Sequence, residues 1–146
     1  MSMKPKEFLD LLNEVRIVKA IAEAERLSSG EVRVYVSHES AKDVMGAAQR
    51  QFIKLGMQKT QARNGVLIFF APAVRQFAIV GDSGIHEKCG DAFWEVTSRD
   101  LSHQLKQGHF TEAVIDAVRK VGDLLVQHFP PKPDDKDELP NAIAGD

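Results

Sequence analysis

The stretch from Arg63 to Ile85 (RNGVLIFFAPAVRQFAIVGDSGI) decides the fold of this chain. Its first apolar run, Val66–Ala71, is rich in β-branched and aromatic residues and shows no alternation, which is typical of a strand buried on both faces. A break at Pro72–Arg75 separates it from a second run, Phe77–Val80, which fits an antiparallel partner. We expect these two strands at the centre of the only sheet.

One more strand and four helical segments are predicted around this pair. Alternation of polar and apolar residues over Glu31–Ser37 (EVRVYVS) indicates a strand with one face on the core. Apolar stripes of helical period predict helices over residues 5–28, about 43–56, about 86–106 and about 110–128. The order predicts an α/β fold, a three-layer α/β/α sandwich with a small mixed sheet flanked by helices.

Two of the helices carry boundary signals. A break or kink is expected between Asn13 and Ile17 in the first helix. Asp43 or Ser40 can cap the second helix, because both residue types accept hydrogen bonds from a first helical turn.

Length and composition favour one domain with a tail. The 146 residues include 43% hydrophobic and 27% charged side chains, and the net charge of −2 combines 19 basic with 21 acidic residues. No basic excess points to nucleic acid as a partner. We expect a folded domain over residues 1–129 and a flexible, acidic, proline-rich tail over residues 130–146.

Nothing in the sequence indicates a membrane or export segment. The N-terminus lacks the apolar core of a signal peptide. No apolar run approaches the roughly 20 residues that a membrane-spanning helix needs. The interpretation is a cytoplasmic protein without a membrane span.

Several motifs recur in this order and spacing in one known family: Ser28–Val34 (SSGEVRV), Phe52–Met57 (FIKLGM), Thr60–Phe69 (TQARNGVLIF), Phe77–Ile85 (FAIVGDSGI), Phe93-Trp94 and Gly108–Phe110 (GHF). Over about residues 15–128 the chain resembles the TPM domain family, named partly for a thylakoid-lumen protein of photosystem II repair. The resemblance implies an α/β/α sandwich. In some members it also implies binding of a divalent metal, usually calcium, and acid phosphatase activity.

Many family members are secreted and membrane-anchored, and they carry an acidic segment before the first helix. This chain has Asn13–Arg16 (NEVR) there, and it resembles the soluble bacterial subgroup.

Strand direction places polar residues at one rim of the predicted sheet. Strands 31–37 and 65–71 should run parallel and strand 76–81 antiparallel, so Glu31, Asn64 and Asp82 should meet at that rim. Glu87 and Asp91 lie one turn apart on the following helix. Such oxygen ligands suit Ca²⁺ or Mg²⁺. We therefore predict a divalent cation site formed by these five residues.

An anion site is predicted beside the cation site. Arg63, Ser83 and Gly84 lie where the next helix would offer free amide groups to an anion. The same Gly-Asp-Ser-Gly segment also fits an ordinary strand-to-helix turn in which Asp82 or Ser83 caps the helix.

A second candidate lies at the carboxyl end of the first strand, where open α/β sheets bind ligands. His38, Glu39 and Asp43 follow that strand, although a solvated loop is the simpler explanation for them.

Three functions are consistent with these patterns. The first is a small module that binds a divalent cation, Ca²⁺ or Mg²⁺, at the Asp82 rim. The second is a metal-assisted phosphatase acting on phosphate monoesters, with Arg63 or the helix amides holding phosphate oxygens. The sequence shows no general base for that reaction, so no catalytic residue is assigned. The third is an interaction module whose acidic tail recruits a protein partner.

Overall fold

A computed structural model describes residues 3–40, 42–90, 92–131 and 143–146. Its elements, in chain order, are α1 (Pro5–Asp10), α2 (Glu14–Arg26), β1 (Glu31–Val36), α3 (Val44–Lys54), the 3₁₀ turn η1 (Met57–Lys59), β2 (Gly65–Ala71), the 3₁₀ turn η2 (Pro72–Val74), β3 (Gln76–Gly81), α4 (Ser83–Cys89), α5 (Ala92–Lys106), α6 (Phe110–His128) and β4 (Ala144–Gly145).

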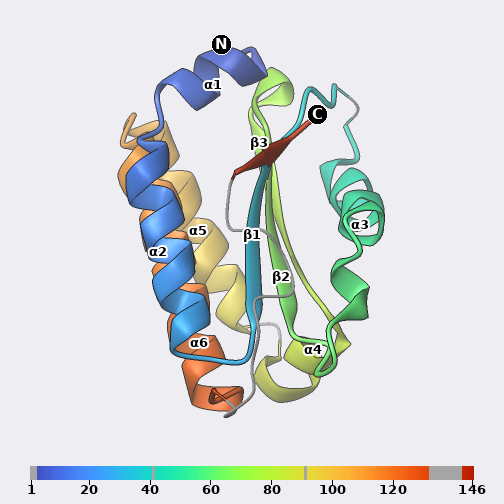
Figure 1. The fold of residues 1–146 in the computed structure, drawn as a ribbon. Helices are drawn as coiled ribbons and strands as arrows, with labels where there is room; N and C mark the ends of the chain where they lie inside the picture. The colour runs from blue at the N-terminus through green and yellow to red at the C-terminus, as the bar shows by residue number, and fades with distance from the viewer. Residues whose placement is uncertain (1–2, 41, 91, 132–142) are drawn as a thin grey trace.

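These elements form three layers (Figure 1). Helices α2, α5 and α6 cover one face of the sheet, and α3 covers the other. The predicted α/β/α sandwich with a mixed sheet is therefore confirmed. Within the described ranges no helix is both long and apolar enough to cross a membrane.

The sheet has the strand order β3-β2-β1-β4. β1 and β2 are parallel, with Glu31 opposite Gly65, and β2 and β3 are antiparallel, with Val66 opposite Gly81. Both predicted directions are confirmed. The expectation that β2 and β3 form the centre is wrong, because β3 pairs only with β2 and lies at an edge of the described sheet, whereas β4 pairs with β1 and makes β1 the second central strand.

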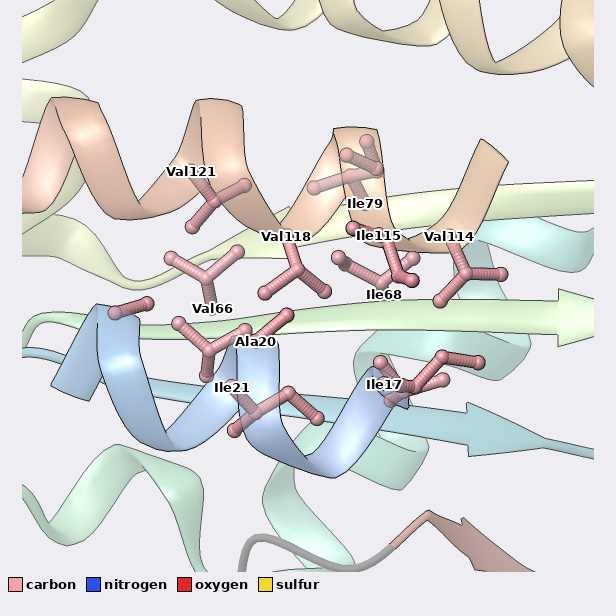
Figure 2. Close-up of a cluster of buried hydrophobic side chains, with 14 of the residues drawn as sticks. Ile17, Ala20, Ile21, Val66, Ile68, Ile79, Val114, Ile115, Val118 and Val121 are labelled. Atoms are coloured by element: carbon pink, nitrogen blue, oxygen red, sulfur yellow. The ribbon is translucent and has the colours of Figure 1, made fainter. Parts of the chain in front are cut away.

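Strand β2 is buried along its whole length and contributes alternate side chains to two apolar clusters. One cluster lies between the sheet and helices α2 and α6. Figure 2 shows Val66 and Ile68 of β2 facing Ile21 of α2 and Val118 of α6 in this cluster. The opposite cluster joins the other side chains of β2, such as Phe69, to α3. The continuous apolar run is thus explained by burial on both faces.

The predicted helix over residues 5–28 consists of two helices. α1 ends at Asp10 and α2 begins at Glu14, just before the interval in which a break was expected. The side-chain oxygen of Asn13 accepts a hydrogen bond from the amide of Arg16 at 3.2 Å, which caps α2. Thr111 of α6 holds the connection, since its hydroxyl accepts from the amide of Asn13 and donates to the carbonyl of Leu11.

The predicted helix over residues 86–106 is also divided. α4 begins at Ser83, three residues earlier than expected, because the side chain of Asp82 caps it. It ends at Gly90, which has a positive φ of 68° that glycine adopts without steric cost. In the second predicted helix Asp43 is the cap, and its Oδ1 accepts from the amide of Gly46 at 2.9 Å.

Most of the predicted tail, residues 132–142, lies outside the described residues. The end of the chain differs from a flexible tail, because Ala144 and Gly145 pair in parallel with Tyr35 and Val36 as β4. The sequence analysis did not predict this strand.

Because β2 is buried on both faces, removing one of its side chains should leave a cavity in the core and lower the stability of the fold. Ile68 is fully buried, whereas Ile53 on α3 is 62% exposed. We expect Ile68→Ala to lower the free energy of unfolding by about 2–5 kcal/mol. The matched change Ile53→Ala should alter it by about 0.5 kcal/mol or less. Urea denaturation measures both, and equal losses would contradict the described packing.

Candidate functional site

The topology brings Glu31, Asn64 and Asp82 to one rim of the sheet, as predicted. The amide of Glu31 donates to the carbonyl of Asn64 at 3.4 Å, and the amide of Asp82 donates to the carbonyl of Gly65 at 3.0 Å. These bonds join the starts of β1 and β2 to the end of β3. The rim lies beside α4 in Figure 1.

Asp82 is the best-anchored side chain of this rim. Its carboxylate is 7% exposed and accepts from Nε of Arg63 at 3.0 Å and from Nη2 of the same residue at 3.3 Å. It also accepts from the amide of Ser83 at 2.7 Å, which caps α4. Arg63 has a positive φ of 52°. The charge of Asp82 is therefore already matched by a fork-shaped cation.

The other predicted cation ligands are arranged less favourably. The side-chain amide of Asn64 donates to the hydroxyl of Ser29 at 3.3 Å, and Glu31 is buried at the start of β1. Glu87 is exposed on α4, and Asp91 lies outside the described residues. No group of three or more His, Cys, Asp or Glu side chains suited to a metal ion occurs in the described part of the chain.

These side chains would need carbonyl oxygens or waters beside them to complete a calcium shell. Calcium takes 6–8 oxygen ligands. The rim brings together two buried carboxylates, those of Glu31 and Asp82, and the second of these is paired with Arg63. The cation site at Asp82, Asn64, Glu31, Glu87 and Asp91 stays a prediction.

The amides expected to bind an anion are already used within the turn. The amide of Gly84 donates to the carbonyl of Arg63 at 2.9 Å, and that of Ile85 donates to the carbonyl of Asp82 at 3.0 Å. A Cβ at residue 84 would lie 2.4 Å from the carbonyl oxygen of Ala62, so glycine is needed for this close approach. Asp82, Ser83 and Gly84 thus form a strand-to-helix turn with Asp82 as the cap, as in the alternative interpretation, and the anion site at Arg63, Ser83 and Gly84 stays a prediction.

A cleft of about 780 Å³ lies at the carboxyl ends of β1 and β2, at the other end of these strands from the Asp82 rim. Tyr35 and Phe69 belong to its lining, and their rings stack with centroids 5.6 Å apart. Its polar and charged residues come from β1, the loop after it, α3 and the chain end: Ser37, His38, Glu39, Ser40, Arg50, Gln51, Lys54 and Asp146.

The side chain of Asp146 is held at this edge by four groups. Its Oδ2 accepts from the hydroxyl of Ser37 at 2.8 Å and from the amide of His38 at 2.7 Å. The ring of His38 approaches the same oxygen at 2.9 Å through Nδ1. The hydroxyl of Tyr35 donates to Oδ1. This edge of β1 is therefore able to bind a carboxylate.

The surroundings of the Asp146 carboxyl favour its ionised form. Burial by itself raises the pKa of the Asp146 carboxyl, but hydrogen bonds from Tyr35, the amide of His38 and Ser37 outweigh burial and lower the pKa below its usual value. Burial, followed by the bond to Asp146, raises the pKa of Tyr35. The phenol consequently stays a donor at neutral pH.

Sequence reasoning found only part of this cleft. His38 and Glu39 line it, whereas Asp43 caps α3 and is not among its lining residues. Arg50 and Lys54 were missed, although their spacing of four residues places both on one face of α3. Asp146 had no signal in the sequence, because only the pairing of β4 brings it to the cleft.

The architecture is that of an α/β protein with a four-stranded mixed sheet and helices on both faces. The sequence profile of the TPM domain matches residues 3–124. The chain therefore belongs to the TPM domain family. A comparison with curated proteins found no match.

Two solved structures have the same fold. The NMR structure of the BA42 protein from the psychrophilic bacterium Bizionia argentinensis is 42% identical in sequence, with a TM-score of 0.84 over 91% of this chain and 92% of that one. The N-terminal domain of the cg2496 protein from Corynebacterium glutamicum is 19% identical, with a TM-score of 0.59 over 76% of this chain and 70% of that one. The second similarity concerns the fold alone.

The lowered pKa of Asp146 predicts release of the chain end in acid. A folded-state pKa below the ordinary value of 3.8 stabilises docking fully above that value, and the stabilisation is lost as pH falls through the folded pKa. We expect the amide signal of His38 and the ring signals of Tyr35 to move together over that window in an NMR titration. Asp146→Asn should remove the transition, whereas Asp123→Asn, at an exposed position on α6, should retain it. A transition unchanged in Asp146→Asn would contradict the assignment.

Proposed function

We propose that this TPM domain protein is a binding module that takes an anionic group, a phosphate or a carboxylate, in the cleft at the carboxyl ends of β1 and β2. The proposal rests on one observation: the carboxylate of Asp146 is bound in this cleft by Ser37, Tyr35 and His38. An external anion of the same shape would find the same donors once Asp146 leaves.

Two cations on α3 support an external anion. Arg50 and Lys54 line the same cleft as Asp146. Neither forms an ion pair within the described parts of the chain. A guanidinium matches two oxygens of a phosphate or carboxylate, and an ammonium adds a point charge. Asp146 would then act as an internal competitor for the ligand.

Titration with inorganic phosphate and p-nitrophenyl phosphate tests the anion site. We expect signals of Ser37, His38 and α3 to shift, and Arg50→Gln/Lys54→Gln to weaken binding by about tenfold or more, since charge-assisted bonds contribute about 1.5–3 kcal/mol each. Asp146→Asn should strengthen binding severalfold by weakening the competitor. Arg26→Gln, an exposed change on α2, serves as the matched control.

Two outcomes would reject the anion site. One is an affinity that is indifferent to the loss of Arg50 and Lys54. The other is a set of shifts confined to the rim around Arg63 and Asp82.

Binding of Ca²⁺ or Mg²⁺ at the opposite rim is the second candidate. It is favoured by the convergence of Glu31, Asn64 and Asp82. Because Arg63 already neutralises Asp82, a cation would compete with the guanidinium for the same oxygens. Hydrolysis of phosphate monoesters is the enzymatic form of this proposal, and turnover of p-nitrophenyl phosphate that disappears in Asp82→Ala would support it.

Competition with Arg63 gives the cation proposal a direct test. We expect Arg63→Gln to bind Ca²⁺ more tightly than the unmodified protein, and Asp82→Asn to lose the binding. Calorimetry and the melting temperature at millimolar Ca²⁺ or Mg²⁺ provide the measurement, with Arg26→Gln again as the control. Absence of heat and of any thermal shift in both the unmodified protein and Arg63→Gln would remove the rim as a cation site.

A further inference from the structure

A second cavity, of about 370 Å³, lies on the other face of the sheet. Its lining includes four phenylalanines from four different elements: Phe8 of α1, Phe70 of β2, Phe77 of β3 and Phe110 of α6. The ring centroids of Phe8 lie 5.2 Å from those of Phe70 and 5.8 Å from those of Phe110, and Phe70 and Phe77 are 6.3 Å apart. The rings therefore form one aromatic wall.

The charged residues of the cavity lining are both cations. Arg75 follows η2, and Lys106 ends α5. Both are exposed, and neither has an ion pair with a described residue. The cavity thus joins an apolar interior to positively charged groups, and no acidic residue occurs among the described residues that line it.

Helix α1 forms one side of the cavity and is tied down at both ends. The amide of Met3, which precedes α1, donates to the carbonyl of Pro72 at 3.1 Å. At the other end Thr111 holds Leu11 and Asn13. The cavity is consequently a formed pocket between fixed elements, and its volume falls in the range of about 300–1,000 Å³ that is usual for small-molecule sites.

We propose that this pocket binds a free amphipathic monocarboxylate, a small acid with an apolar chain or ring. The apolar part would lie against the four phenylalanines, and the carboxylate would face Arg75 and Lys106. The charge pattern decides the class of ligand, because a neutral apolar molecule would leave both cations unused and a cationic one would be repelled. The site shares no lining residue with the anion cleft and does not depend on it.

A chain-length series of octanoate, decanoate and decanol tests the proposal. We expect decanoate to bind about fourfold more tightly for each methylene it adds to octanoate, as long as the added groups are buried. Decanol should bind at least about tenfold more weakly than decanoate, since a hydrogen bond to a charged group contributes about 1.5–3 kcal/mol. Calorimetry gives the affinities, and NMR shifts of the rings of Phe8, Phe70, Phe77 and Phe110 give the location.

Surface variants separate ligand binding from folding. Arg75→Gln/Lys106→Gln changes two exposed side chains and should weaken decanoate by about tenfold or more, while leaving decanol unchanged. Arg119→Gln, an exposed change on α6 outside the pocket lining, should leave both affinities unchanged. Circular dichroism confirms that each variant is folded.

Any of four results would overturn the proposal. The first is equal affinity for decanoate and decanol. The second is an affinity for decanoate that is the same in Arg75→Gln/Lys106→Gln as in the unmodified protein. The third is binding to anionic lipid vesicles without any binding of the free acid, which would indicate a membrane-facing surface. The fourth is a concentration-dependent dimer whose formation shifts the same four rings, which would indicate that a second copy covers the pocket.

Discussion

The complete burial of β2 is the constraint on which the other elements depend. All seven residues of Gly65–Ala71 are buried, so their backbone groups need partners along both edges of the strand. β1 provides the parallel partner and β3 the antiparallel one. Apolar layers must then cover both faces, which α2 and α6 do on one side and α3 on the other. The two ends of β2 consequently fix the positions of the Asp82 rim and of the cleft beside Asp146.

The main parts of this arrangement could be predicted because their signals are local. The apolar run of β2, the alternation of β1 and the break before β3 each identify a strand, and the connections determine their directions. The central position of β1 could not be predicted, because it depends on β4. That strand is Ala144–Gly145, two residues without strand character, and long-range hydrogen bonds from Tyr35 and His38 to the carboxylate of Asp146 hold it beside β1.

The candidate sites were predictable to different degrees for a similar reason. Strand direction alone brings Glu31, Asn64 and Asp82 together. The ion pair between Arg63 and Asp82 was not predicted, and neither was the positive φ of Arg63, because the local sequence gives no signal for either feature. Arg50 and Lys54 were visible as neighbours on one helix, but nothing local indicated that a carboxylate 108 residues after His38 would bind near them.

The packing of α2 against α6 also has a consequence for synthesis of the protein. Thr111 on α6 and Asn13 before α2 are 98 residues apart in the chain, yet they are joined by a hydrogen bond. On a ribosome, α2, β1, α3 and β2 emerge well before α6. The part of the apolar face that α6 covers therefore stays exposed until translation of the domain is almost complete. Contacts between such distant segments slow folding and prolong exposure to aggregation. Nascent chains stalled before Phe110 should therefore be favoured clients of chaperones that recognise apolar surface.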